Sequence, residues 1–216
     1  MSIRFACNEE GERARGIARA AQALAHGDLV VMPTDTVYGI GCDAFSPSAV
    51  ASLLAAKGRG RAMPPPVLIP HVRTLDGITT QVPAPVRALA EAFWPGGLTI
   101  VCHAQPTLNW DLGDTHGTVA VRMPLHPVAL ELLGRTGPLA VTSANLTGQP
   151  AAVNCDQAQE QLGDAVAVYL DAGASGSGVA STIVDGTKEV PVILREGGIT
   201  RAQLAEVLPE LKEPAT

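Results

Sequence analysis

The chain has 216 residues, of which 46% are hydrophobic, 17% are charged and 3% are aromatic, and its net charge is −6. This length and composition suit one globular domain with an aliphatic core and exclude a disordered chain. The negative charge and the scarcity of aromatic residues argue against a broad nucleic-acid-binding surface, which needs a basic stripe and stacking platforms.

The cysteines and the N-terminus indicate a cellular setting. The four cysteines, at positions 7, 42, 102 and 155, are scattered and form no Cys-x-x-Cys pair. Reduced thiols are therefore expected, in preference to a zinc site or a redox dithiol. The N-terminal residues lack the apolar core of a signal peptide, and no apolar run approaches the length of about 18 residues that spans a membrane. We expect a cytoplasmic protein that does not contact membranes.

The first half of the chain alternates predicted helices with short apolar strands. Helices are expected where alanine-rich segments end near glycine or a Pro-Gly step, at 9–26, 46–57 and 84–93. Ser46 and Pro47 suit the N-cap and first position of the second helix. Strands are expected at the apolar runs 29–32, 67–69 and 98–102.

A polar turn follows the first of these strands. Thr34, Asp35 and Thr36 come just after it, and a second apolar run, interrupted by Gly39 and Gly41, follows. Glycine within a strand pattern indicates a bulge or the close approach of another backbone or a ligand. The segment suits the floor of a ligand site, although an ordinary hairpin with a polar turn fits the spacing equally well.

Cations alternate with glycine after the second helix, where Lys57, Arg59 and Arg61 are separated by Gly58 and Gly60. A solvated helix end tolerates such charges. Anion binding is favoured, because glycine lets the backbone come close to a bound group and guanidinium groups bind phosphate and carboxylate through paired donors.

The second half continues the alternation of strands and helices. Strands are expected at 118–122, 139–141 and 166–170, with a hairpin formed by 181–185 and 190–195. Helices are expected at 126–133 and 156–162, and Thr200 with Gln203 forms a capping box for a last helix.

Polar residues again follow two of these strands. Arg122, on the same strand face as Thr118, is either a surface charge or a carboxylate clamp. The segment 142–145 (Thr-Ser-Ala-Asn) lies where open α/β sheets bind ligands. Hydrogen bonding by Ser143 and Asn145 is favoured over a serine nucleophile, since no Gly-x-Ser-x-Gly motif is present, and turn formation is the simpler alternative.

Two loops have open interpretations. The loop 109–117 contains Asp111, Asp114 and His116, which suggest a metal site, but a solvated surface loop is favoured because no regular structure places a second ligand group. The glycine-rich segment 171–178 is expected to be a mobile loop, either an inert linker or a lid.

Six segments, taken in order, resemble the YrdC/Sua5 family. No single segment is decisive, and the specificity lies in their order over nearly the whole span from Gly27 to Arg195. The matching segments are 33–39 (Pro-Thr-Asp-Thr-Val-Tyr-Gly), 57–59 (Lys-Gly-Arg), 94–96 (Trp-Pro-Gly), 121–124 (Val-Arg-Met-Pro), 142–145 (Thr-Ser-Ala-Asn) and 181–184 (Ser-Thr-Ile-Val).

The resemblance implies an α/β fold, a YrdC-like single domain with a twisted mixed β-sheet flanked by helices around a concave ligand cavity. It would span 1–216, with a core of about 10–208, and would lack the C-terminal Sua5-type domain of longer members. The implied enzyme is a nucleotidyltransferase, L-threonylcarbamoyladenylate synthase. It makes threonylcarbamoyl-AMP, pyrophosphate and water from ATP, L-threonine and bicarbonate, for the t6A37 modification of tRNA. Mg²⁺ would accompany ATP, with no tightly bound organic cofactor. The threonylcarbamoyl transferase complex would be a partner, and tRNA itself an indirect one.

The resemblance also implies residue roles. Lys57 and Arg59 would be catalytic. L-threonine would be bound by Thr34, Arg122, Thr142 and Ser181, with Arg122 pairing with its carboxylate. ATP would be bound by Lys57, Arg59, Arg61, Thr118, Ser143, Asn145 and Arg195. The family pattern usually has proline after Lys-x-Arg, where this chain has Gly60 and Arg61, and a histidine earlier than His71, so His71 receives no role.

Two alternatives stay open. One is an RNA-binding module of the same fold, against which the low charge and few aromatic residues argue. The other is a paralogue that acts on a different amine.

Overall fold

The computed structural model describes residues 2–176 and 178–212. The strands in this part of the chain are β1 (Ile3–Ala6), β2 (Val30–Met32), β3 (Gly39–Asp43), β4 (Val67–Leu68), β5 (Leu98–His103), β6 (Thr118–Arg122), β7 (Leu139–Ser143), β8 (Val168–Asp171), β9 (Thr182–Asp185) and β10 (Val192–Arg195). The helices are α1 (Glu10–Ala25), α2 (Pro47–Ala56), α3 (Thr74–Ile78), α4 (Ala84–Phe93), α5 (Pro127–Thr136), α6 (Cys155–Leu162), the 3₁₀ turn η1 (Gly163–Ala165) and α7 (Arg201–Val207).

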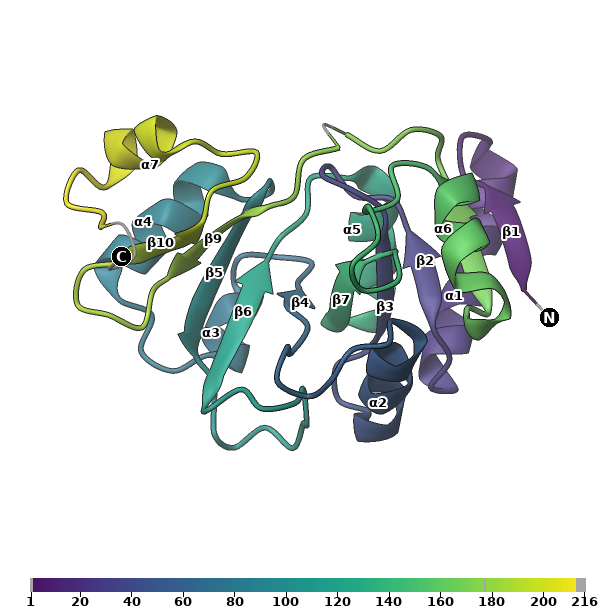
Figure 1. Ribbon diagram of the computed structural model, residues 1–216, viewed down its shortest axis with the longest axis horizontal. Coiled ribbons are helices and arrows are strands. Elements are labelled where there is room, and N and C mark those ends of the chain that lie inside the picture. The colour runs from purple at the N-terminus through teal and green to yellow at the C-terminus, as the bar shows by residue number, and fades with distance from the viewer. Residues whose placement is uncertain (1, 177, 213–216) are drawn as a thin grey trace.

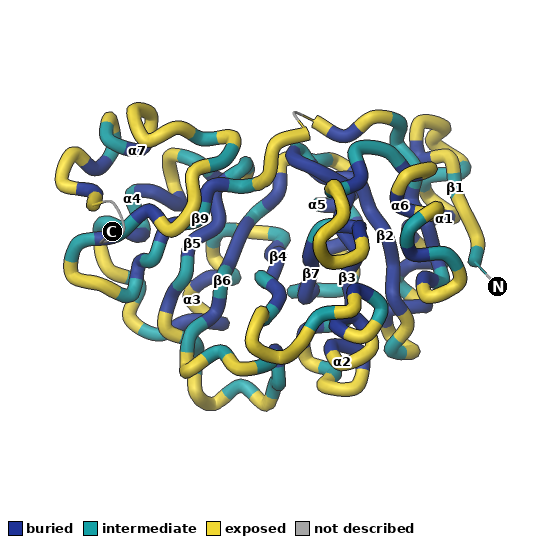
Figure 2. The backbone as a smooth tube through the Cα atoms, in the orientation of Figure 1, coloured by how far each residue is buried: buried dark blue, intermediate teal, exposed yellow. Residues whose placement is uncertain are grey.

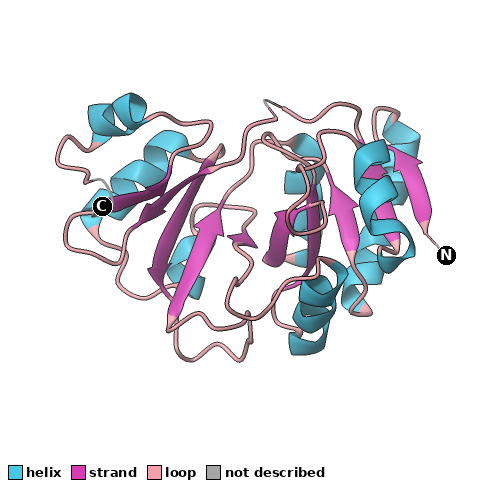
Figure 3. Cartoon of the chain, viewed as in Figure 1, coloured by secondary structure: helices cyan, strands magenta, loops and turns pink. Residues whose placement is uncertain are grey.

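The strands form one mixed sheet in the order β1-β8-β2-β3-β7-β4-β6-β5-β9-β10. Four neighbouring pairs are parallel, namely β1/β8, β2/β8, β4/β6 and β5/β9. The sheet runs along the long axis of the molecule, with helices packed around it (Figures 1 and 3). The α/β class and the mixed sheet expected from the family resemblance are confirmed.

Side chains alternate between two apolar cores along the buried strands. Val30 and Met32 of β2 point to the core that α1 and α5 cover, whereas Val31 between them points to the other core. Such a period of two is the direct consequence of strand geometry. The central strands are accordingly buried and the loops around them exposed (Figure 2).

Local signals correctly predicted several element ends. The Ser46 side chain accepts a hydrogen bond from the Ala49 N–H at the start of α2, and Thr200 and Gln203 form the capping box of α7. Gly27, with φ of 85°, follows α1 in the left-handed conformation that favours glycine at a helix end.

Short or weakly signalled elements were missed or shifted. The sequence prediction did not include β1 or the five-residue helix α3, whose N-cap side chain makes no capping bond. The strand expected at 166–170 begins instead at Val168, because η1 extends the preceding helical turn and the Val166 N–H bonds to the Gly163 carbonyl. Strand β7 extends through Ser143, two residues beyond its predicted end.

The described part of the chain contains no helix that combines the length and the apolar character needed to cross a bilayer. All four cysteines are buried as free thiols.

Candidate active site

The polar turn after β2 is built by its own hydroxyl groups. The Thr34 hydroxyl donates to the Val37 carbonyl at 2.6 Å and accepts from the Thr36 N–H at 3.2 Å. This local pattern is typical of threonine in turns. Both threonines are buried, so the turn presents a rigid polar surface at the end of the strand.

Arg122, the last residue of β6, is bound to this turn. Its Nη2 lies 2.6 Å from Asp35 Oδ1, its Nη1 donates to Thr36 Oγ1 at 2.9 Å, and its Nε donates to the Gly96 carbonyl at 2.9 Å. The Arg122 side chain is 8% exposed and that of Asp35 is 16% exposed. The guanidinium is thus buried and held in one orientation, which excludes the surface charge that the sequence had left open, while its role as a carboxylate clamp stays a prediction.

Positive charge exceeds negative charge around Arg122. Burial lowers the pKa of Arg122; Asp35 opposes that shift and the nearby Arg195 adds to it. Burial also lowers the pKa of Arg195, which donates to the Ser181 carbonyl from Nη2 at 2.7 Å. A lowered pKa means that the cation is poorly compensated, so a bound anion would stabilise it.

Arg59 supplies a third cation, and its side chain is partly buried. It lies in the loop after α2, and its Nη1 donates to Thr142 Oγ1 at 3.1 Å. Among the residues that the structure describes, its Nε is the only buried side-chain nitrogen or oxygen without a hydrogen-bond partner. Burial lowers the pKa of this guanidinium as well. An unpaired buried donor is costly unless a ligand satisfies it.

Lys57 holds the segment 142–145 in place. Its Nζ donates to the Ser143 carbonyl at 2.6 Å, to the Asn145 carbonyl and to Asn145 Oδ1 at 3.3 Å. Burial and then the charge of Arg59 lower its pKa to about 8. Three oxygen acceptors match the three N–H bonds of an ammonium group, so protonated Lys57 ties the end of α2 to the end of β7.

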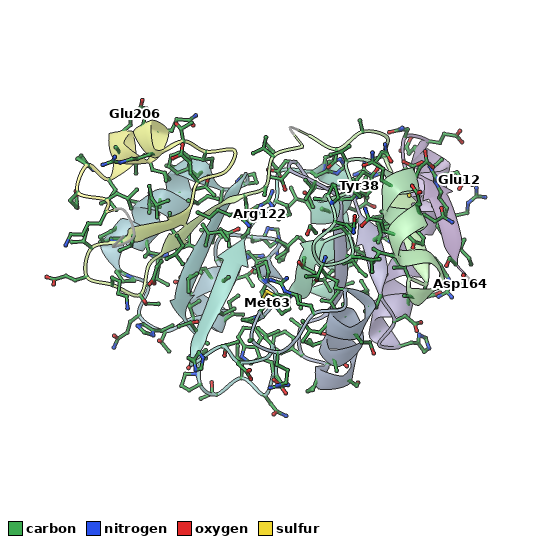
Figure 4. The ribbon with its side chains drawn as sticks, viewed as in Figure 1. Glu12, Tyr38, Met63, Arg122, Asp164 and Glu206 are labelled. Carbon is green, nitrogen blue, oxygen red and sulfur yellow. The ribbon has the colours of Figure 1, made fainter. Side chains whose placement is uncertain are left out.

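These groups surround a cavity of about 410 Å³, a size that suits a small-molecule ligand. Figure 4 shows two residues of its wall, Arg122 and Tyr38, near the middle of the molecule. The residues predicted for the site that line it are Thr34, Arg59, Arg122, Thr142, Ser143, Ser181 and Arg195. The predicted site residues outside this lining are Lys57, Arg61, Thr118 and Asn145.

Two of these four make their hydrogen bonds with the loop 109–117. Arg61 is exposed and forms a bidentate ion pair with Asp111, in which both N···O distances are 2.9 Å. Its Nε also lies 3.4 Å from Asp114 Oδ1. The acidic residues of the loop 109–117 therefore pair with arginine in the structure. Thr118 donates to the Thr115 carbonyl at 2.8 Å. The nucleotide contacts expected of Arg61 and Thr118 stay predictions.

The glycines of β3 allow close packing beneath the cavity. A Cβ atom at Gly39 would lie 2.7 Å from Val141 Cγ1, and one at Gly41 would lie 2.8 Å from Val141 Cγ2. The sequence had predicted a bulge or the close approach of another backbone or a ligand at these glycines. The nearest group is instead a side chain, Val141 of β7.

The sequence prediction assigned no role to Asp35, Thr36 or Thr99. Asp35 and Thr36 were detectable from their position beside Thr34 in the polar turn. Thr99, whose hydroxyl donates to Ser181 Oγ at 2.9 Å, offered no such signal, because it looks like an ordinary strand residue.

Comparison with known proteins supplies the family. Residues 22–197 match the Sua5/YciO/YrdC family model, described as "Telomere recombination". The chain is 59% identical over 208 residues to a Mycobacterium leprae protein named putative threonylcarbamoyl-AMP synthase, covering 96% of this chain and 94% of that protein. It is 38% identical over 194 residues to Bacillus subtilis threonylcarbamoyl-AMP synthase, covering 89% of this chain and 56% of that protein.

A solved structure supports the same family. Pyrococcus abyssi Sua5 in complex with L-threonine superposes with a TM-score of 0.89 at 33% identity, covering 99% of this chain. This chain spans 62% of that longer protein. On sequence and structure together, the chain belongs to the Sua5/YciO/YrdC family.

Proposed function

We propose that the chain is an L-threonylcarbamoyladenylate synthase, which forms threonylcarbamoyl-AMP and pyrophosphate from ATP, L-threonine and bicarbonate. The observation that carries the proposal is that Arg59, Arg122 and Arg195 line one cavity, and that the buried Nε of Arg59 has no partner among the described residues. The names of the relatives and the L-threonine complex of Pyrococcus abyssi Sua5 support the same activity.

The amino acid would bind on the Arg122 side. Arg122 uses one N–H on each of its three nitrogens within the protein, which leaves one N–H on each terminal nitrogen for a carboxylate. Thr142 and Ser181 border the same space. The triphosphate would bind at Arg59, whose guanidinium provides charge-assisted donors. Ser143 and Asn145, held by Lys57, would contact the nucleotide.

The chemistry requires no enzyme nucleophile. The threonine amine attacks bicarbonate and water leaves, which gives a carbamate. A carbamate oxygen then attacks the α-phosphorus of ATP, and pyrophosphate leaves with the electron pair of the broken P–O bond. Positioning and neutralisation of the developing charge carry such a transfer, and the fixed cations of this cavity suit that task.

Mg²⁺ would enter with ATP. The described residues bring together no group of three or more His, Cys, Asp or Glu side chains, and Asp35 is already paired with Arg122. Mg²⁺ is commonly held by substrate phosphates and water with few protein ligands, so this arrangement fits an ion carried by the nucleotide.

The product would serve the t6A modification of tRNA in the cytoplasm, through delivery to a threonylcarbamoyl transferase complex. The family membership and the relatives' names support this assignment. In this scheme tRNA meets the product through the transferase complex and has no direct contact with this chain.

The test is pyrophosphate release by the purified protein with ATP, Mg²⁺ and bicarbonate, with and without L-threonine. Release that requires both threonine and bicarbonate is expected. Release with another amine in place of threonine would favour the paralogue with a different acceptor. Absence of both nucleotide binding and turnover would contradict the proposal, and RNA titration would then test the remaining alternative.

A further inference from the structure

The connection from β8 to β9 passes over the site. Residues 172–180, here called the strap, join strands that are separated in the sheet by β2, β3, β7, β4, β6 and β5. Figure 1 shows this connection running over the upper edge of the molecule. The described residues of the strap, 172–176 and 178–180, make specific contacts with the Thr34–Thr36 turn beneath them.

Two hydrogen bonds join the strap to the backbone of that turn. The Ser175 hydroxyl donates to the Thr34 carbonyl at 2.6 Å, and the Gly178 N–H donates to the Thr36 carbonyl at 3.0 Å. Ser175 is 4% exposed, which is unusual for serine in a glycine-rich loop. The strap at this point is a buried structural contact.

Between these bonds the strap lies directly against the turn. A Cβ atom at Gly176 would lie 1.8 Å from the Asp35 carbonyl oxygen and 2.4 Å from its carbonyl carbon. Both groups are backbone, so rotation of a side chain cannot relieve the clash. The approach is possible only with glycine at position 176.

Both ends of the strap are anchored to the site. At its start, the Tyr38 hydroxyl donates to the Gly173 carbonyl at 2.7 Å and accepts from the Ala172 N–H at 3.1 Å. At its end, Ala180 and the following Ser181 line the cavity, and Ser181 is bonded to Arg195. The strap therefore connects the turn to the opposite wall of the cavity.

We propose that the strap is a positioning element for the amino-acid half of the site. By holding the backbone of residues 34–36, it keeps Asp35 and Thr36 in place, and these two side chains orient Arg122. Its residues need not touch substrate. The effect on L-threonine rests on the proposed function, whereas the bracing of the turn does not.

The test compares Gly176→Ala and Ser175→Ala with a control, Gly134→Ala, where an added Cβ on α5 meets no atom within 4 Å. Hydrogen–deuterium exchange of residues 33–38 and the Kd values for L-threonine and ATP are measured on each protein. Ser175→Ala is expected to weaken threonine binding roughly tenfold, the cost of one buried hydrogen bond. Gly176→Ala is expected to weaken threonine binding about a hundredfold through misplacement of the Arg122 guanidinium.

Both variants should exchange faster at residues 33–38 and keep ATP affinity within about threefold of wild type, and Gly134→Ala should match wild type. Unchanged exchange and threonine affinity in Ser175→Ala would overturn the proposal. Equal losses of threonine and ATP affinity would also overturn it, because they indicate general destabilisation. If the wild-type protein binds no L-threonine, the proposed function fails, and the exchange data alone decide whether the strap holds the turn.

Discussion

At the scale of single residues, the character of the candidate site depends on which arginines already have a carboxylate partner within the protein. Arg61 pairs with Asp111 and Asp114 at the surface, whereas Arg59 keeps a buried donor without a partner among the described residues. The two arginines are two positions apart in the chain, yet their environments differ completely. A buried cation without a partner favours a bound anion, since water screens it poorly there.

Arg122→Lys should weaken L-threonine binding about a hundredfold. Lysine keeps the charge but cannot bridge Asp35, Thr36 and Gly96 while presenting donors to a carboxylate. Isothermal titration with L-threonine measures the loss. The matched control is Arg135→Lys, an exposed pair with Glu131, which should leave the affinity unchanged. An unaltered affinity in Arg122→Lys would remove Arg122 from the site.

ATP affinity should fall as the pH rises through about 8, the pKa to which burial lowers Lys57. Below that pH the ammonium holds Ser143 and Asn145; above it the neutral amine loses one donor. The free energy of unfolding responds in the opposite direction. Because the pKa of Lys57 is about 8 in the folded chain and 10.5 as the ordinary value, the folded chain releases its proton first. Lys57 therefore adds to the stability of the fold as the pH rises above about 8. Titration with ATP from pH 6.5 to 9.5 checks the first effect. Lys57→Arg, which stays charged, should flatten the profile, and an identical profile would contradict this role.

At the scale of elements, capping groups and strand ends place the site. Helix α2 begins at a serine cap and ends at Lys57, which reaches the end of β7. Helix α5 begins at His126, whose Nδ1 accepts a hydrogen bond from the Val128 N–H at 3.3 Å. A histidine can act as this acceptor only while Nδ1 carries no proton.

His126 should make the protein less stable as the pH falls below 6.5. Burial lowers the pKa of His126 from 6.5, so the unfolded chain gains the proton before the folded chain does. Stability from this group is therefore present above that pH and is lost as acidity increases. Urea unfolding between pH 5 and 7.5 measures it. His126→Asn keeps a capping acceptor without titrating and should show a smaller pH dependence, while His103→Asn, on an exposed end of β5, should behave as wild type. Equal slopes in all three proteins would contradict the prediction.

At the scale of the whole molecule, the cavity is assembled from distant parts of the sheet. Its walls come from the turn after β2, the end of β6, the end of β7 and the hairpin of β9 and β10. Strands β9 and β10 are joined by the short connection 186–191. The turn after β2, the end of β6 and the end of β7 come from separate parts of the chain, so their contacts depend on the complete sheet. A ligand that fills the cavity would contact these parts together and would therefore bind only the assembled fold.

Ligand binding should therefore raise the melting temperature. ATP at a hundredfold excess over its Kd should stabilise the fold by about 2.7 kcal/mol, which for a chain of this size corresponds to roughly 5–10 °C. Differential scanning fluorimetry with ATP and Mg²⁺ measures the shift. Arg59→Ala should abolish it, whereas Arg87→Ala, at an exposed pair with Asp76, should retain it. A full shift in Arg59→Ala would place the nucleotide elsewhere.

Much of the fold was predictable because its signals are local. Ser46 with Pro47 and Thr200 with Gln203 mark helix starts through bonds within one turn of the chain. Strand β1 escaped prediction because it is four residues long and largely exposed, so no apolar alternation marks it. Helix α3 escaped because it is five residues long and has no side-chain cap.

The sequence by itself determined the periodic elements, the polar residues at the strand ends and the family resemblance. The pairing of those polar residues was decided only by the tertiary structure. Asp35 and Arg122 are 87 positions apart, and Arg61 and Asp111 are 50 apart. Electrostatic compensation depends on distance through space and on burial, and neither follows from position along the chain. The folded sheet therefore decides that Arg61 is paired at the surface and that Arg59 lines the cavity, with one buried N–H that has no partner among the described residues.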